Sequence, residues 1–219
     1  MSKNYNNVLV VSPHADDEVI GCGGTLLNHS QQGNKVSWIL MTDVSQESSF
    51  KKKRTMQIDK IKKRLKIKKF INFSLKPSSL KFSMDSQIID KIKMEIKKIN
   101  PNIIYLPYMH DIHTDHYFTT RYFLSCLKWF RQKSVKKILC YETVSETNLN
   151  FNLGKFSPNY YVDISKNFNK KLQLLKIYKS EVKKHPFPRS VDSVTALNKI
   201  RGSESGYKFA ESFDLIYSR

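Results

Sequence analysis

The sequence is poor in cysteine, glycine and proline, and it lacks long apolar runs. Its 219 residues include only 3 Cys, 7 Gly and 7 Pro. This composition excludes collagen-like and low-complexity disordered chains, and an odd number of widely spaced cysteines argues against a disulfide framework. No apolar run is long enough to cross a membrane, and the polar first residues have no signal-peptide pattern. We therefore expect a cytoplasmic protein with one domain over residues 1–219.

Acidic residues and arginine are also scarce. The chain has 19 Asp and Glu against 38 Lys and Arg, which gives a formal charge of +19, yet only 7 of the 38 basic residues are Arg. A strongly basic chain suggests a nucleic-acid-binding protein, but Arg is the side chain suited to bidentate contacts with phosphates and bases. Asn, Ile, Phe and Tyr, which share A/T-rich codons with Lys, are frequent, so genome composition explains much of the Lys excess. We therefore expect no specific nucleic-acid partner, although a positive field would steer an anionic small molecule or surface to the protein.

Short β-branched apolar runs alternate with segments of helical spacing. The apolar runs predict strands over residues 8–11, 36–41, 69–73, 103–106 and 137–141. The helical spacing predicts helices over residues 17–30, 46–66, 85–99 and 115–131. This alternation is typical of an α/β fold with a mostly parallel sheet flanked by helices. The last third predicts a small C-terminal extension with strands over 160–164 and 212–217 and helices over 166–179 and 191–200.

A cluster of acidic residues and a histidine follows the first predicted strand. Residues 12–18 read SPHADDE, in a chain with few carboxylates. Adjacent carboxylates repel one another, and a divalent cation would relieve that repulsion. His14 and Asp17 are three residues apart at the start of a predicted helix, where both side chains point the same way and could share one metal. The alternative is an acidic helix start that complements the helix dipole.

A second cluster follows the fourth predicted strand. Residues 110–116 read HDIHTDH and contain three of the six histidines. His113 and His116 are three residues apart, and the intervening acidic residue could fix a tautomer. In a parallel sheet both clusters lie at the carboxyl edge, so two His and one Asp could form a zinc site with an open position, with spare groups for proton transfer. The alternative is a polar loop with unrelated histidines.

The glycines of residues 21–24, GCGG, match neither a dinucleotide-binding nor a P-loop pattern. We expect them to let a helix pack closely against the sheet. The thiol of Cys22 has no neighbour in sequence that would lower its pKa. No G-x-S-x-G elbow is present, which disfavours a serine hydrolase.

Several motifs resemble one known family. Residues 13–26, PHADDEVIGCGGTL, are similar to the signature of the PIG-L/LmbE-like metal-dependent N-deacetylases, and residues 113–116, HTDH, match that family's H-x-D-H motif. The similarity continues in order through residues 160–165, 201–206 and 209–213 (FAESF, close to Y-A-E-x-F). The resemblance implies a Rossmann-like α/β fold and hydrolysis of an acetamido group on an N-acetylglucosamine-type sugar.

The resemblance also implies roles for individual residues. The implied metal ligands are His14, Asp17 and His116. The implied ion is Zn²⁺, with Fe²⁺, Mn²⁺ or Co²⁺ as alternatives. The implied catalytic residues are Asp16 as general base, His113 as electrophile and acid, and Asp115, which orients His113.

The chain departs from the family pattern at positions that would affect the substrate. Val44 replaces a frequent Gly, the R-x-x-E pattern appears as Arg54 followed by Gln57, and a frequent Asp is missing around residues 77–78. Candidate substrate-binding residues are Arg54, Glu142, Glu146, His185, Arg189 and Arg201. The alternative for each is surface solvation or a local ion pair.

The sequence therefore predicts a zinc-dependent N-deacetylase acting on an N-acetylated amino sugar, in cell-surface polysaccharide, glycolipid or thiol-cofactor synthesis. The alternatives are a metal-dependent amidase on a thiol conjugate and a basic nucleic-acid-binding module. Residues 51–69 contain eleven basic residues against Asp59 alone. This segment is either a solvated helix face, a contact for an anionic membrane surface, or a site for a nucleotide-linked or lipid-linked sugar. A homo-oligomer is compatible with the sequence.

Overall fold

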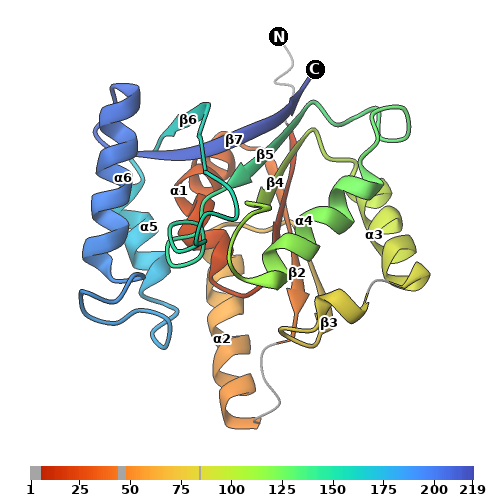
Figure 1. Cartoon of the computed structure of the whole chain (residues 1–219), viewed down its shortest axis with the longest axis horizontal. Helices are drawn as coiled ribbons and strands as arrows, with labels where there is room; N and C mark the ends of the chain where they lie inside the picture. Colours follow the sequence, from red (N-terminus) through yellow and green to blue (C-terminus); the bar gives the residue numbers. More distant parts are fainter. Residues whose placement is uncertain (1–5, 44–47, 84) are drawn as a thin grey trace.

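The computed structural model describes residues 6–43, 48–83 and 85–219. A seven-stranded sheet lies at the centre, with helices on both faces (Figure 1). The strands are β1 (Asn7–Ser12), β2 (Lys35–Thr42), β3 (Lys69–Leu75), β4 (Ile103–Pro107), β5 (Lys137–Tyr141), β6 (Tyr160–Asp163) and β7 (Ala210–Ser218). The helices are α1 (Asp17–Gln31), α2 (Ser48–Arg64), the short 3₁₀ helix η1 (Leu80–Ser83), α3 (Ser86–Ile99), α4 (Thr114–Cys126), α5 (Phe168–Leu175) and α6 (Val191–Ser205).

The predicted parallel sheet is confirmed. The strand order is β3-β2-β1-β4-β5-β7-β6, and the first five strands in this order pair in parallel. The C-terminal extension joins the same sheet, because β7 pairs antiparallel with both β5 and β6. The chain leaves β1 towards β2 on one side and returns to β4 on the other. The gap beyond the carboxyl ends of β1 and β4 is therefore the switch point at which open α/β sheets bind their ligands.

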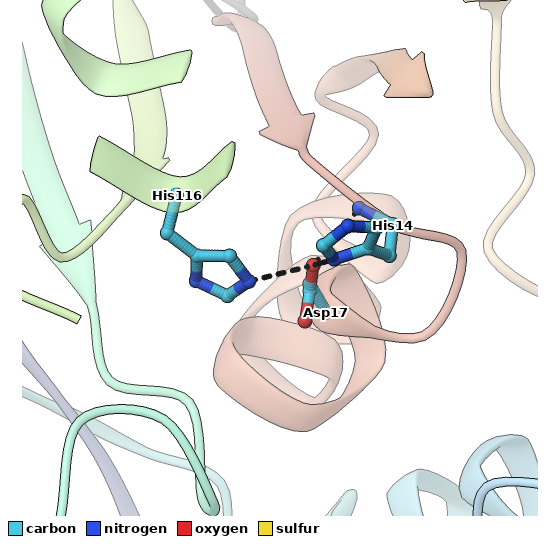
Figure 2. Close-up of side chains that lie close together, drawn as sticks. All are labelled: His14, Asp17 and His116. Atoms are coloured by element: carbon cyan, nitrogen blue, oxygen red, sulfur yellow. Dashed lines mark hydrogen bonds and ion pairs between the residues drawn. The ribbon is translucent and has the colours of Figure 1, made fainter. Parts of the chain in front are cut away.

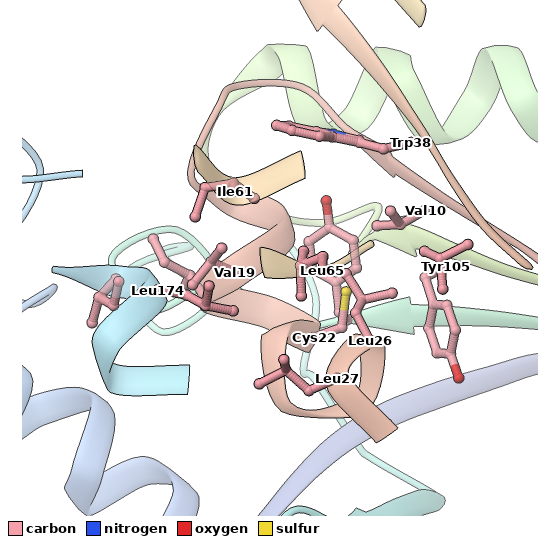
Figure 3. Packing of buried hydrophobic residues seen from close by; sticks show 14 of the residues in the cluster. Val10, Val19, Cys22, Leu26, Leu27, Trp38, Ile61, Leu65, Tyr105 and Leu174 are labelled. Carbon is pink, nitrogen blue, oxygen red and sulfur yellow. The ribbon is translucent and has the colours of Figure 1, made fainter. Parts of the chain in front are cut away.

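Alternating side chains of the central strands enter two separate cores. On β1, Val8 and Val10 pack in the cluster that contains α1, α2 and α5, part of which is drawn in Figure 3. Leu9 and Val11 point to the opposite layer, against α3 and α4. All four are fully buried, and each such side chain contributes about 1.5–3 kcal/mol of hydrophobic free energy. Burial on both faces explains why this strand reads as a continuous apolar run.

Three predicted helices differ from the observed ones in length. The helix predicted over residues 191–200 is longer and continues as α6 to Ser205. The helix predicted over residues 115–131 ends at Cys126, because the chain turns there and brings Leu127 and Val135 into the core. The helix predicted over residues 166–179 is the shorter α5. The prediction of helix from residue 46 falls partly outside the described residues, and α2 is described from Ser48.

Helix α1 is broken at Cys22, whose φ of −142° and ψ of 21° are not helical. A buried ion pair lies across this break. Lys171 Nζ donates to the carbonyl of Ile20 before it, and Glu211 accepts from the backbone N–H groups of Gly24 and Thr25 after it. The helix halves thus have their freed backbone groups satisfied by side chains from α5 and β7.

The glycines of α1 pack as the sequence predicts. A Cβ on Gly21 would lie 2.2 Å from the ring of Tyr141 on β5, and a Cβ on Gly24 would lie 2.7 Å from Ile164. Cys22 is fully buried, and burial raises the pKa of its thiol well above the ordinary value. Its position and its pKa exclude a nucleophilic role for Cys22.

Candidate metal centre and active site

The loop between β1 and α1 carries the first cluster. The carbonyl of Pro13 accepts hydrogen bonds from the amide and the hydroxyl of Thr42 on β2 (3.1 and 2.7 Å). The His14 amide donates to Asp17 Oδ2 (2.9 Å) in the first turn of α1. These contacts fix the loop at the carboxyl edge of the sheet.

The second cluster lies at the start of α4, after β4. His113 is the N-cap residue of this helix, and its Nδ1 accepts from the amide of Asp115 (3.1 Å). His116 follows in the first turn and is almost fully buried. The two clusters are about a hundred residues apart in the chain, and the parallel sheet brings them together.

His14, Asp17 and His116 converge on one point (Figure 2). Asp17 Oδ2 lies 3.4 Å from His14 Nδ1 and 3.3 Å from His116 Nε2. One ligand atom from each residue lies within 4.8 Å of the others, an arrangement that could hold a metal ion. The convergence that the sequence predicts for these three residues is present in the structure.

In both His14 and His116, the ring nitrogen that faces away from Asp17 is hydrogen-bonded to another carboxylate. His116 Nδ1 donates to Asp111 Oδ2 (2.7 Å), and His14 Nε2 donates to Asp115 Oδ2 (3.1 Å). In the neutral rings, the nitrogens that face Asp17 therefore carry a lone pair and no proton. Three electron-rich atoms that face one another require positive charge between them, supplied by protons on the rings or by a cation. Two imidazoles and one carboxylate, with carboxylates behind both rings, are a fitting donor set for a divalent transition metal.

The raised pKa values of His14 and His116 also indicate that this arrangement favours positive charge. Burial opposes protonation of His14, but hydrogen bonds to Asp115 and Asp17 outweigh it and raise the pKa of His14 to about 9. Burial likewise opposes protonation of His116, and the charges and hydrogen bonds of Asp17 and Asp111 raise its pKa well above the ordinary value. Burial also opposes ionisation of Asp17, yet His116 holds the pKa of that carboxyl well below its usual range.

Asp16 faces the same cavity from between the two predicted ligands of the first cluster. The residue is 2% exposed, and its Oδ2 accepts from Arg189 (2.8 Å). Burial first, and then the charge of Asp17, raises the pKa of Asp16 to about 7, with Arg189 acting in the opposite direction. A carboxyl group with a pKa near neutrality is suited to exchange protons at physiological pH.

The carboxylate of Asp115 lies against His14, whereas we expected it to orient His113. This carboxylate contacts His14 and accepts from the backbone amide of Ser78 (2.7 Å), whereas His113 Nδ1 is 4.0 Å away. His113 is oriented mainly by the backbone amide of Asp115. Burial, followed by the charges of His14 and His116, lowers the pKa of His113 to about 4. The ring is therefore neutral at pH 7, with its proton on Nε2.

A cavity of about 360 Å³ is lined by His14, Asp17 and His116. Three of the predicted substrate-binding residues line it as well: Arg54, Glu146 and Arg189. Glu142 and His185 line a neighbouring cavity of about 520 Å³. Arg201 lines a third and forms a two-pronged ion pair with Glu142 (both N···O distances 2.7 Å). The second and third cavities are not lined by His14, Asp17 or His116.

Sequence reasoning missed two residues of the site. Asp111 holds the ring of His116, and Thr147 in turn donates to Asp111 (2.5 Å). Glu181 lines the cavity and pairs with Arg54, and it lies 3.6 Å from Arg189. Asp111 was within the second cluster, where a carboxylate behind a ligating histidine is a common arrangement. Nothing near Glu181 in the sequence indicates its place.

Comparisons with known proteins identify a family and a set of similar folds. Residues 9–127 match the family described as PIG-L, GlcNAc-PI de-N-acetylase. The N,N'-diacetylchitobiose deacetylase from Pyrococcus horikoshii is a similar solved structure, with a TM-score of 0.79 and 20% identity over 98% of this chain and 85% of that chain. The A40926 pseudoaglycone deacetylase Dbv21 has a TM-score of 0.73 and 15% identity over 99% of both chains.

Another similar structure is that of an enzyme named for a different reaction. The 4-carboxy-2-hydroxymuconate hydratase GalB from Pseudomonas putida has a TM-score of 0.76 and 15% identity, over 97% of this chain and 96% of that chain. At these identities the likenesses establish the fold, and the reaction has to be argued from the site.

Proposed function

The chain belongs to the PIG-L family, and on this premise we propose that it is a metal-dependent hydrolase that removes the acetyl group from an N-acetylated amino sugar. The observation that carries the proposal is the convergence of His14, Asp17 and His116 at a cavity that also contains the carboxyl group of Asp16. The family description and the chitobiose deacetylase neighbour support an acetylated amino sugar as the substrate class.

We propose that His14, Asp17 and His116 hold one divalent ion. Two imidazoles and a carboxylate with a free position suit Zn²⁺, and Fe²⁺, Mn²⁺ and Co²⁺ accept the same ligands. When bound, such an ion supplies a Lewis acid that polarises the acetamide carbonyl and makes a water acidic enough to attack at neutral pH.

Asp16 is proposed to act as the base. Arg189 holds its Oδ2, while Oδ1 has no hydrogen-bond partner among the residues that the structure describes. This oxygen takes the proton of the attacking water as the water oxygen bonds to the acetyl carbon. The same carboxyl group returns the proton to the nitrogen as the C–N bond breaks, which leaves a free amine and acetic acid, and the acid then loses its proton to give acetate.

His113 is proposed to stabilise the charge that develops on the carbonyl oxygen. Because its Nδ1 accepts the amide of Asp115, a neutral ring donates from Nε2. A neutral imidazole donor placed where negative charge appears lowers the barrier. The acid role that the family resemblance implies for His113 is not needed in this scheme, because Asp16 carries the proton.

We also propose a single domain and a reducing compartment for this protein. We place the chain in one catalytic domain, because the second cluster, Glu181 and Arg189 all meet at one cavity. Cys22, Cys126 and Cys140 are all unpaired and buried, which supports a reducing compartment such as the cytoplasm. Among the described residues, every helix is too short or too polar to span a bilayer.

The test combines metal analysis with product analysis. We expect about one divalent ion per chain and release of acetate from acetylated amino sugars. His14→Ala and His116→Ala should lose the metal, whereas His185→Ala, outside the metal cavity, should keep it. Asp16→Asn should keep the metal and lose at least about 100-fold in acetate release. Wild-type metal content in the two alanine variants, or cleavage products other than acetate, would refute the assignment.

A further inference from the structure

A second concave surface lies beside the cavity of the three proposed metal ligands, which we call the metal cavity. Two cavities of about 520 and 510 Å³ form this surface, and both are lined by Glu142, Thr147, Asn148 and Leu197. Because they share these residues, they form one surface, which we call the α6 groove. Its two sides can be followed in Figure 1 as the blue-green loop after β5 and the blue helix α6. Each cavity has a size typical of small-molecule sites, which span about 300–1000 Å³.

The α6 groove and the metal cavity share two stretches of chain. In the first stretch, Glu146 lines the metal cavity and the next residue, Thr147, lines the groove. In the second, Pro188 lines the groove and Arg189 lines the metal cavity. Thr147 also donates to Asp111 (2.5 Å), the residue behind one of the proposed metal ligands. A molecule whose acetamido group lies in the metal cavity can therefore extend into the groove.

Side-chain amides line one end of the groove. Asn148, Asn150 and Asn152 alternate with exposed apolar side chains, and all three line the groove. Asn148 Oδ1 accepts from the amide of Ser145 (2.8 Å), and Asn150 Nδ2 donates to the carbonyl of Gly154. In the part of the chain that the structure describes, Asn148 Nδ2, Asn150 Oδ1 and the whole side-chain amide of Asn152 have no hydrogen-bond partner. These groups offer both donors and acceptors to a ligand.

A buried hydroxyl lines the other end of the groove. Thr143 follows β5 by two residues and is 1% exposed. Its hydroxyl has no hydrogen-bond partner among the residues that the structure describes. Buried hydroxyls without a partner are rare because they cost free energy, and a hydroxyl group on a ligand would recover it. The Thr143 hydroxyl is therefore an independent indication that this surface binds a polar ligand.

The groove is electrically balanced, although the chain has a formal charge of +19. With His neutral, its lining contains two carboxylates, Glu142 and Asp192, and two cationic groups, Lys155 and Arg201. Glu142 and Arg201 pair with each other at 2.7 Å. This balance favours a neutral ligand over an anion or a cation.

The rest of the groove is largely apolar. Its lining includes Val144, Phe156, Pro186, Pro188, Leu197 and Ile200. A pyranose ring has the matching double character, because its C–H faces are apolar and its hydroxyl groups project from the edge. An alkyl chain would cover the apolar side chains but would leave the asparagine amides and the Thr143 hydroxyl unpaired, which costs free energy.

We propose that the substrate is an oligosaccharide, with its acetylated sugar in the metal cavity and its neighbouring neutral sugar units in the α6 groove. This inference rests on the proposed function and deepens it. The asparagine amides and the Thr143 hydroxyl bind sugar hydroxyl groups, and the apolar side chains contact the C–H faces of the rings. The sugar units in the groove thus hold the acetamido group in place without taking part in its hydrolysis.

The test uses the metal-loaded protein and compares the β-1,4-linked tetramer of N-acetylglucosamine with the methyl glycoside of the monomer. The tetramer should have a kcat/KM at least about tenfold higher, beyond the roughly fourfold gain from its number of acetyl groups, because contacts remote from the reacting bond raise kcat/KM. Ala196→Trp places a large ring in the groove from an exposed position on α6 and should lower the ratio to about fourfold or less. Asn152→Ala, which removes one unpaired amide, should lower the ratio by about 2–10-fold.

Matched controls carry the same substitutions outside the groove. Ser203→Trp places the same ring at an exposed position of α6 that lines neither cavity, and Asn169→Ala removes an exposed amide from α5. Both controls should keep the wild-type ratio. Because each result is a ratio of two substrates on the same protein, a loss of folded protein in a variant does not change it.

A wild-type ratio of about fourfold or less, or an equal loss in the matched controls, would overturn the inference while acetate release from the monomer still supports the proposed function. The octyl glycoside of N-acetylglucosamine tests for an alkyl occupant. A gain larger than that of the tetramer, abolished by Ala196→Trp, would also overturn the inference.

If no substrate releases acetate, the proposed function fails, and calorimetric binding of the tetramer then decides the role of the groove. Binding that is lost in Ala196→Trp and kept in Ser203→Trp supports the groove as an oligosaccharide site. Absence of binding to the wild type overturns it.

Discussion

Removing one charge of the buried ion pair across the break in α1 should destabilise the fold strongly. Lys171 and Glu211 are each about 1% exposed, and their charged atoms are 2.7 Å apart. Besides Lys171, Glu211 accepts from the amides of Gly24 and Thr25 (2.8 and 2.7 Å) and from the Thr25 hydroxyl (2.6 Å). Glu211→Gln keeps the shape of the side chain but removes the charge and one acceptor oxygen.

The expected loss follows from these contacts. Breaking a buried pair costs about 3–5 kcal/mol, because the remaining charge, here the ammonium of Lys171, stays buried without compensation. A chain of this length unfolds about 2–4 °C lower for each kcal/mol lost. Glu211→Gln should therefore lower Tm by roughly 6–20 °C. The underlying loss of about 3–5 kcal/mol is a large part of a typical free energy of unfolding of about 5–15 kcal/mol.

The assay is urea and thermal unfolding followed by circular dichroism, in a double-mutant cycle. Lys171→Met/Glu211→Leu should be less destabilised than the sum of the two single variants, by about 1–3 kcal/mol. Lys62→Gln, which breaks the exposed pair with Asp59, is the control and should change the unfolding free energy by less than about 0.5 kcal/mol. A loss below about 1 kcal/mol for Glu211→Gln, or strict additivity in the cycle, would show that the pair does not stabilise the break.

Three further results are expected. Asp111→Ala should weaken metal binding about 10–100-fold in a chelator competition, because the ring of His116 loses its anchor; unchanged affinity would contradict this role. Burial lowers the pKa of His29 to about 4, so the unfolded chain binds a proton from about pH 6.5 downwards while the folded chain does not. His29→Gln should therefore reduce the loss of unfolding free energy between pH 7 and pH 4 by at most about 3 kcal/mol, and an identical pH profile would refute it. Gly21→Ala should cost about 1–3 kcal/mol in urea unfolding, since its Cβ would lie 2.2 Å from an aromatic ring, whereas Gly23→Ala, with its nearest neighbour at 3.4 Å, should cost little.

The sheet and the meeting of the two histidine clusters could be predicted because both depend on local pattern and on one topological rule, whereas the choice of His116 over His113 comes from the family resemblance. The run VLVV of residues 8–11 is apolar on both faces, which requires a central strand covered on two sides. Once β1 and β4 are parallel, the residues after both strands share one edge. His14 and His116 could thus be brought together without knowledge of any side-chain contact.

Other parts of the site depend on contacts that the sequence does not encode locally. Glu181 follows a helix that was predicted too long, and its partner Arg54 lies on α2. Lys171 is one of many lysines in the sequence, and no periodicity distinguishes the fully buried one from its exposed neighbours. The position of Asp115 against His14, rather than His113, depends on ring orientations that only the folded structure defines.

The order of the sheet has a consequence for how the protein is made. Strand β7, which comes after the other six strands in the chain, lies between β5 and β6. During synthesis β6 therefore has no partner strand, and the outer edge of β5 stays open, until β7 emerges from the ribosome. The same strand carries Glu211, which accepts from backbone N–H groups after the break in α1. A premature stop before residue 210 would therefore leave an open sheet edge and unpaired backbone N–H groups in α1. Both features make a nascent chain a target for chaperones and proteases.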